Sequence, residues 1–414
     1  MFMNLAGRSL VVAMCLGQLG NLLPHVAVPA VMRQHLMPAW GLGGAEAGMM
    51  ASALAFGYMF AVPFLTRLTD RIDARNVLLV GSIGSALVTL AFGLFANGLW
   101  SATLIWGLVG VGFAGAYMPG LKALTDRLPP GDVSRSVTLY TSCFSVGVGL
   151  SFLVSQVVAD NFGWRWAFVA SGCGPFLMVA ACLAMPAVKP LPTEDRLLDF
   201  RPVLHNRLLG YGAHCFELYG IRTWLVAFWT FVAARHAGST FFGPVTVSVV
   251  FSLLAMPASI LGNEAALRFG RHRALTVLMV VSACIALTIG LSVQAPPALL
   301  LILLLAYAFA APADSGALTS GMAMSASAPN KGATMALHTT VGFGLSALGA
   351  WGAGIMLDLA GGPDSASARR HGSQYSACSV VRSCLDHLLF GGHERQPRGS
   401  GKRRSVTGFP DTLI

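Results

Sequence analysis

Charged side chains are scarce in this sequence, and their scarcity excludes an ordinary water-soluble domain. Asp, Glu, Lys and Arg make up 11% of the 414 residues, against 55% hydrophobic residues. Runs of around 20 apolar residues recur along the chain, and each is long enough to cross roughly 30 Å of hydrocarbon as a helix. Backbone groups in lipid need internal hydrogen-bond partners, so these runs are expected to be helices. The sequence therefore predicts an all-α polytopic membrane protein.

Several chemical signatures are also lacking. The sequence has no phosphate-binding loop, metal-ligand cluster or nucleophile constellation, so neither an ATP-driven pump nor a membrane enzyme is expected. Of its eight cysteines, six lie singly inside apolar runs, which argues against a disulfide framework. The basic residues do not cluster as in a nucleic-acid surface. We expect no cofactor, no metal and no nucleic-acid partner.

Eleven apolar runs are long enough to be membrane spans. The predicted spans are residues 9–32, 47–66, 76–96, 100–125, 136–159, 164–186, 208–234, 240–262, 274–293, 298–325 and 332–358. If the N-terminus is cytoplasmic, fifteen basic residues fall in cytoplasmic gaps and only Arg33, Arg165 and Arg235 fall outside. This bias predicts the orientation, with a cytoplasmic N-terminus, in a cell membrane such as the bacterial inner membrane.

The chain repeats itself at an offset close to 196 residues. Arg71 follows the second predicted span as Arg268 follows the eighth, and the segment 147–149 (Gly-Val-Gly) corresponds to 342–344 (Gly-Phe-Gly). Two parallel, pseudo-symmetric halves are expected, each beginning on the cytoplasmic side. The predicted divisions are an N-terminal six-helix bundle at 1–186, a cytoplasmic linker at 187–207, a C-terminal bundle of five helices at 208–360 and a polar tail at 361–414.

Two segments carry a resemblance to a known family. The loop after the second span keeps Asp70, Arg71 and Arg75 of the pattern G-x-x-x-D-R-x-G-R-R, and residues 163–168 read Gly-Trp-Arg-Trp-Ala-Phe. Over residues 8–360 the chain resembles the major facilitator superfamily. The resemblance implies two six-helix bundles, alternating access and a substrate site at mid-membrane, lined by helices 1, 4, 7 and 10.

The charged loop is expected to act as a conformational latch. A carboxylate at Asp70 suits the positive N-terminal end of a neighbouring helix, and Arg71 or Arg75 is expected to reach Asp126 at the end of the fourth span. Such contacts form only when the cytoplasmic side is closed, so they favour the outward-facing state. The alternative is that these charges are solvated turn residues.

The second half repeats this latch only in part. It keeps Arg268 and Arg271, but Leu267 replaces the acidic residue. The matching contact is therefore in doubt in this half.

Ionisable and polar groups deep in a span are candidates for function because they are costly to bury in lipid. The substrate-binding candidates are Arg222, Glu217, Asp314, His25, Asn21 and Tyr307. Arg222 is the only cation deep in a predicted span, and an anionic substrate is the simplest reason for it. The alternative is a structural ion pair with Asp314 or Glu217. These two carboxylates are also the candidates for proton coupling.

The substrate is not identified by the sequence. Glycine-rich fifth and eleventh spans resemble the cyanate and nitrate porter branches, although such glycines are also ordinary packing residues. No arginine lies inside the second or eighth span, which disfavours nitrate.

The polar tail replaces the twelfth span that the repeat demands. This suggests a shifted reading frame or a displaced terminus, unless the tail is genuinely disordered. The predicted function is a monomeric secondary transporter of a small anionic solute. Coupling to protons is a further expectation. The alternative is a membrane protein that no longer transports, such as a truncated product or a sensor that keeps the fold.

Overall fold

The computed structural model describes residues 7–189, 208–236, 240–319, 331–359 and 361, and the regular structure in these ranges is helical. The predicted linker, from residue 190 onward, and the predicted tail, apart from Gly361, lie outside the described residues. The N-terminal half contains α1 (Gly7–Leu22), α2 (Ala27–Val31), a short π-helix (Met32–Leu36), α3 (Met37–Trp40), α4 (Gly44–Leu68), α5 (Ala74–Phe95), α6 (Leu99–Thr125), α7 (Pro130–Phe162), α8 (Trp164–Cys173) and α9 (Phe176–Ala184).

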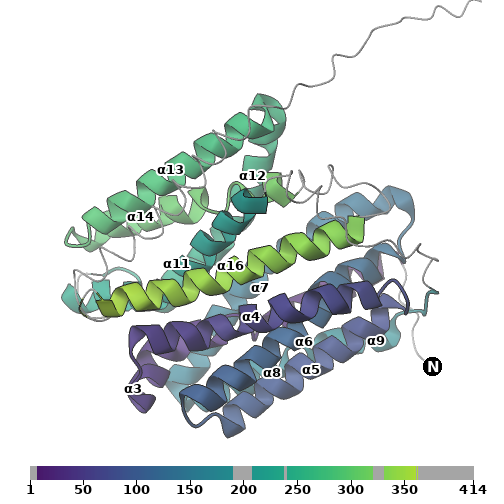
Figure 1. Cartoon of the computed structure of the whole chain (residues 1–414), viewed down its shortest axis with the longest axis horizontal. Helices are drawn as coiled ribbons and strands as arrows, with labels where there is room; N and C mark the ends of the chain where they lie inside the picture. The colour runs from purple at the N-terminus through teal and green to yellow at the C-terminus, as the bar shows by residue number, and fades with distance from the viewer. Residues whose placement is uncertain (1–6, 190–207, 237–239, 320–330, 360, 362–414) are drawn as a thin grey trace, which may run out of the picture.

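Among the described residues, the helices of the C-terminal half are mostly longer. They are α11 (Leu208–Arg235), α12 (Pro244–Phe269), α13 (Arg271–Leu291), α14 (Pro297–Ala310) and α16 (Lys331–Leu359). In Figure 1 the long helices run roughly side by side, with α13 and α14 far from α5 and α9. Helix α16 lies along α4, so the C-terminal half meets the N-terminal half there. A second contact between the halves joins α7 and α12.

Helices lie in the described parts of all eleven predicted spans, but the predicted number of spans is not confirmed. Within the described residues, nine helices are long and apolar enough to cross a membrane, and a bent pair, Gly7–Leu22 with Ala27–Trp40, makes up to ten. Helix α11 is not among them. Its 28 residues would extend about 42 Å at 1.5 Å per residue. It is therefore long enough, and its buried His214, Glu217 and Arg222 lower its hydropathy.

Three of the predicted spans are broken by turns that contain proline. The sixth breaks at residues 174–175, which include Pro175. The first bends by 48° where residues 23–26, including Pro24 and His25, form turns between α1 and α2. The tenth breaks at residues 311–314, which include Pro312 and Asp314. Proline lacks the N–H that would continue the helix. Broken helices inside a membrane are tolerated where they line a protein interior, and transporters use them at binding sites.

The sequence analysis placed the end of the eighth span too early. Helix α12 continues to Phe269, so residues 263–269, expected as a loop, are helical. The turn is made by Gly270, whose φ of 86° is in the left-handed region that glycine adopts without strain. In the N-terminal half, α4 already ends at Leu68. The two charged segments are therefore not equivalent in structure.

Small residues allow α4 and α16 to approach closely. A Cβ atom added to Gly44 would lie 2.7 Å from the carbonyl oxygen of Gly354, and one added to Gly48 would lie 2.9 Å from that of Ala350. Such backbone proximity needs residues without bulky side chains. Gly344 and Gly354 of the eleventh span thus pack against α4 of the other half, whereas Gly342 and Gly349 pack against α11, in agreement with the packing interpretation.

Arg165, one of the three basic residues predicted to lie outside, binds the end of α5. Its guanidinium donates hydrogen bonds to the carbonyl oxygens of Gly93 at 2.9 Å and Ala96 at 3.3 Å, and to Oδ1 of Asn97 at 3.0 Å. These carbonyls have no partner within their own helix. The Gly-Trp-Arg-Trp segment therefore joins the start of α8 to the end of α5.

Candidate functional site

Helix α11 carries three ionisable side chains into the protein interior. His214, Glu217 and Arg222 are 4%, 3% and 4% exposed. Most buried charges in proteins are paired or hydrogen-bonded, because desolvation is costly. The partners of these three groups therefore distinguish a structural role from a functional one.

Glu217 is held by two hydroxyl groups from other helices. Its Oε1 accepts hydrogen bonds from Ser282 on α13 at 2.6 Å and from Tyr307 on α14 at 2.7 Å. Tyr307, expected as a substrate ligand, is thus brought to the candidate coupling carboxylate. Both partners are neutral hydroxyl groups, which can hydrogen-bond to a carboxylate or to a protonated carboxyl group. Glu217 can therefore gain or lose a proton without losing these partners.

Asp314 pairs with His214 and not with Arg222. His214 Nδ1 lies 2.6 Å from Asp314 Oδ1, and both side chains are about 95% buried. Asp314 is in the broken segment of the tenth span, where turns replace regular α-helix. The pair is a titratable unit in the interior of the C-terminal half, and neither partner is a permanent charge.

Arg222 has no ionic partner among the residues that the structure describes. Its guanidinium carbon lies 6.0 Å from the ring centre of Phe144 on α7, and its Nε has no hydrogen-bond acceptor there. The expected alternative, an ion pair with Asp314 or Glu217, is not formed in this conformation, because both carboxylates bind other groups. Arg222 thus faces the N-terminal half as a buried cation.

His25 and Asn21 place polar groups from the first span in the same interior. His25 Nε2 lies 3.1 Å from the hydroxyl of Tyr219, which joins the broken first span to α11. Asn21 is 1% exposed, and neither its Oδ1 nor its Nδ2 has a hydrogen-bond partner in the described ranges. His25 is therefore a contact between the halves, and Asn21 is an unsatisfied amide.

The predicted cytoplasmic end is held together by a pair that the sequence analysis did not single out. Both carboxylate oxygens of Asp73 accept hydrogen bonds from Arg127 Nη2, at 2.8 and 2.7 Å, and Asp73 also accepts from the N–H of Val188 at 2.8 Å. Arg127 donates further to the carbonyl oxygen of Pro186 at 2.8 Å. Asp73 thus connects the start of α5, the end of α6 and the chain after α9.

The predicted latch residues are arranged differently from expectation. Arg75 donates to the carbonyl oxygen of Met185 at 2.7 Å, and Asp126 pairs with Lys122 at 3.0 Å, so Arg75 does not reach Asp126. No described residue hydrogen-bonds to the Asp70 carboxylate, and burial raises its pKa above the usual value. The latch role of Asp70 and Arg71 stays a prediction.

In the C-terminal half, the matching charges are a surface pair. Arg268 lies 3.0 Å from Glu264 one helical turn earlier on α12, and both side chains are more than half exposed. Arg271 begins α13 directly after the Gly270 turn. The predicted counterpart of the first latch therefore lacks the geometry of the Asp73–Arg127 pair.

At the opposite, predicted outer end the halves are joined by another carboxylate that the sequence analysis missed. Asp358, near the end of α16, accepts hydrogen bonds from the backbone N–H groups of Gly44 and Ala45 at the start of α4, both at 2.7 Å. A carboxylate is favourable there because the N-terminal end of a helix carries partial positive charge. Asp358 therefore connects the two halves directly.

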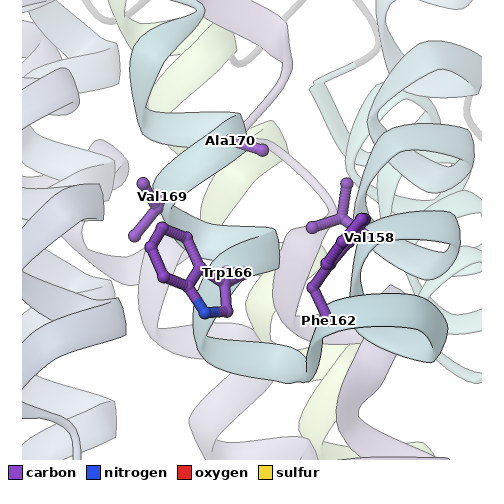
Figure 2. A pocket seen from close by; sticks show the side chains of 5 residues that line it. All are labelled: Val158, Phe162, Trp166, Val169 and Ala170. Atoms are coloured by element: carbon purple, nitrogen blue, oxygen red, sulfur yellow. The ribbon is translucent and has the colours of Figure 1, made fainter.

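An apolar groove lies between the C-terminal end of α7 and α8, away from the charged interior. Figure 2 shows its lining, which consists of Val158, Phe162, Trp166, Val169 and Ala170. None of these side chains is charged, and Trp166 is 60% exposed. The groove cannot neutralise an anion, so the candidate site remains the interior around Arg222.

These features agree with the comparison to protein families. The model of the Major Facilitator Superfamily matches residues 10–350. The chain belongs to this superfamily.

Curated relatives of the chain include transporters of several compounds. It is 31% identical to a gallate transporter of Pseudomonas putida over 37% of this chain and 34% of that protein. It is 25% identical to a gentisate transporter of Corynebacterium glutamicum over 67% and 66% of the two chains. It is 28% identical to a D-galactonate transporter of Escherichia coli over 34% and 33%. The matches thus span only about one third of the gallate and galactonate transporters.

Solved structures share the fold across most of the chain. A bacterial homologue of the human lysosomal transporter Spinster, in an inward-facing and occupied conformation, matches with a TM-score of 0.76 and 17% identity, covering 92% of this chain and 96% of that one. A D-xylose–proton symporter matches with a TM-score of 0.73 and 14% identity, covering 92% and 97%. The helices described above therefore adopt the major facilitator fold, while the expected kinship to cyanate and nitrate porters stays a prediction.

Proposed function

We propose that this protein is a secondary transporter that moves a small organic anion by alternating access, coupled to protons. The observation that carries the proposal is Arg222, which is 4% exposed between the halves without an ionic partner in the described residues. A buried cation of this kind is unfavourable unless an anion joins it during part of the cycle. The gallate, gentisate and galactonate transporters are named for carboxylates, which supports the same class of solute.

The coupling groups of this proposal are Glu217 and Asp314. Each is buried and hydrogen-bonded or paired within the C-terminal half, to Ser282 and Tyr307 in one case and to His214 in the other. A proton on either carboxylate changes the net charge around Arg222 by one unit. Anion binding and proton binding at this site then favour each other, which is the requirement for symport.

Alternating access requires one state that is closed at the outer end and another that is closed at the cytoplasmic end. Asp358 closes the predicted outer end, whereas none of the described residues engages the Asp70 carboxylate at the predicted cytoplasmic end. We assign this arrangement to the inward-facing state. The orientation is part of the proposal, and a cysteine introduced into the 187–207 linker should react with an impermeant reagent only after the membrane is opened.

Uptake into liposomes tests the proposal. The purified full chain, reconstituted with an imposed proton gradient, is expected to accumulate gallate, gentisate or galactonate. Arg222→Gln should abolish uptake, and Arg222→Lys should weaken it, because lysine keeps the charge but loses the bidentate geometry. Arg235→Gln is the matched control, since Arg235 is an exposed arginine on the same helix.

Two results would contradict this proposal. Rescue of Arg222→Gln by a second neutral change at Asp314 or Glu217 would show that Arg222 belongs to a structural pair in another conformation. Absence of uptake of all three anions by the folded wild-type protein, with or without a gradient, would favour the non-transporting alternative.

A further inference from the structure

A cluster of aromatic side chains from both halves lies next to Arg222. We call the following residues the aromatic cluster: His25, Tyr58, Phe113, Tyr117, Phe144, Tyr219 and Phe343. They come from the broken first span and from α4, α6, α7, α11 and α16. Each ring lies close to at least one other member, so the cluster is continuous across the boundary between the halves.

The cluster centres on His25. Its ring centre lies 5.0 Å from that of Phe113, 5.2 Å from Phe144 and 5.9 Å from Tyr219. Tyr58 and Phe343, from opposite halves, stack with ring centres 3.8 Å apart. The three His25 spacings are those of favourable aromatic pairs.

Part of the cluster is not packed as in a closed core. Tyr58, Phe113 and Phe343 are buried, but Tyr117, Phe144 and Tyr219 each keep a partly exposed face. Phe144 is the ring that lies 6.0 Å from the Arg222 guanidinium carbon. The buried cation therefore lies next to a ring that is itself only partly buried.

Several polar atoms in this region lack partners in the described part of the chain. They are Nδ1 of His25, the hydroxyl of Tyr58 and Nε of Arg222, all on residues no more than 5% exposed. Buried polar groups without partners are rare, and such a group indicates a missing water or ligand. Two of these atoms belong to the aromatic cluster and the third to the adjacent Arg222, so a ligand with an anionic group beside an aromatic body would supply partners here.

We infer that the transported anion is a monocyclic aromatic carboxylate. The inference rests on the proposed function and specifies its substrate class. The carboxylate binds the Arg222 guanidinium, and the ring lies against Phe144 and His25. A ring hydroxyl is the group that Tyr58 or His25 can pair with. An open-chain polyhydroxy acid would leave its hydroxyls facing aromatic rings without partners, which disfavours it strongly.

The test compares carboxylates whose carbon skeletons differ in planarity or in polarity. Proteoliposomes containing the full chain are assayed for uptake of labelled 4-hydroxybenzoate and for its inhibition by benzoate, cyclohexanecarboxylate and galactonate. Benzoate and cyclohexanecarboxylate have the same charge and ring size, but only benzoate is planar. We expect benzoate to inhibit about tenfold more strongly than cyclohexanecarboxylate, and galactonate to inhibit least.

A variant shows whether the aromatic cluster causes this preference. Phe144→Leu should reduce the benzoate preference toward unity while leaving anion uptake measurable. Phe162→Leu is the control, because Phe162 is on the same helix but is 71% exposed and outside the cluster. If Phe144→Leu does not fold, the inhibition series on the wild-type protein decides alone.

The failures of the two proposals are distinguishable. Uptake of galactonate with no preference for benzoate over cyclohexanecarboxylate would overturn the aromatic substrate and leave organic-anion transport intact. A folded protein that transports none of these carboxylates would overturn both.

Discussion

The two halves of the protein share one fold but bury different chemistry. Inside the spans of the N-terminal half, the buried polar side chains are uncharged or weakly basic, for example Gln18, Asn21 and His25. In the C-terminal half, Glu217, Arg222 and Asp314 are all buried. The buried charged groups of the spans thus belong to the C-terminal half, while the N-terminal half contributes most residues of the aromatic cluster.

At the predicted cytoplasmic ends, it is the N-terminal half that buries a charged pair. In the N-terminal half, the Asp73–Arg127 pair is largely buried, with side chains 10% and 2% exposed. In the C-terminal half, the Glu264–Arg268 pair is on the surface, with side chains 51% and 71% exposed. An ion pair in water contributes little, whereas loss of one partner of a buried pair leaves an uncompensated buried charge. The repeat in sequence therefore does not preserve the interaction.

The largest expected effect is on the Asp73–Arg127 pair. Asp73→Asn should lower the free energy of unfolding by about 3 kcal/mol, because it leaves Arg127 buried without its counter-charge. The measurement is thermal unfolding of the purified protein in detergent. Glu264→Gln, which breaks the exposed pair in the other half, should change stability by no more than about 1 kcal/mol. Equal effects of the two changes would remove this difference between the halves.

The same pair should depend on pH in one direction. Burial alone would raise the pKa of Asp73, but Arg127 and the N–H groups of Val188 and Arg75 hold it below its usual value. The stabilisation is thus complete at neutral pH and is lost as the pH falls below the ordinary range of an aspartate. In Asp73→Asn, this acid-dependent part of the unfolding profile should be absent.

Glu217→Gln tests the assignment of proton coupling to the C-terminal half. The amide keeps the size of the side chain and can still accept from Ser282 and Tyr307, but it cannot bind a proton. Exchange of labelled anion between the two sides should persist, whereas accumulation driven by a proton gradient should stop. Glu264→Gln is the exposed control. Normal accumulation by Glu217→Gln would show that Glu217 is not the coupling group. Asp314 would then be the remaining candidate among these carboxylates.

Asp358→Asn should open the predicted outer end. Loss of the charge at the start of α4 should cost the closed state about 1 kcal/mol, a shift of roughly fivefold in population. Reaction of a cysteine placed at Ser52, a buried position on α4, should become faster from outside. The matched control is Glu46→Gln, because Glu46 accepts from the N–H of Gly43 within the same half at 3.0 Å. If the cysteine reacts equally fast in Glu46→Gln, the faster reaction reflects local loosening of α4 and not separation of the two halves.

The smallest effect is expected for Asp70→Asn. Its carboxylate has no hydrogen-bond partner in the described residues, so the neutral form should leave this conformation nearly unchanged and destabilise only the state closed at the cytoplasmic end. The expected shift toward the inward-facing state is under about 1 kcal/mol. Reactivity of cysteines facing the cytoplasmic side measures it. A shift in the opposite direction would contradict the latch role.

Much of the fold was predictable because it depends on local sequence. The ends of α6 and α11 fall within one residue of their predicted positions, since a run of apolar residues determines where a helix can lie in lipid. The end of α12 was missed by seven residues, because Glu264 and Arg268 look like loop residues although they pair across one helical turn. The candidate residues of α11 were found for the reason that ionisable groups are conspicuous in apolar surroundings.

The sequence by itself determined the class of the protein, the places of its helices and the small set of buried charges. Only the tertiary structure decided which groups meet: Asp314 with His214, Asp73 with Arg127, and Asp358 with the start of α4. Pairing of residues far apart in the chain depends on how helices cross, and hydrophobic patterns carry no information on partners. Arg222 shows both sides of this, since its depth was readable from the sequence while its lack of an ionic partner among the described residues was not.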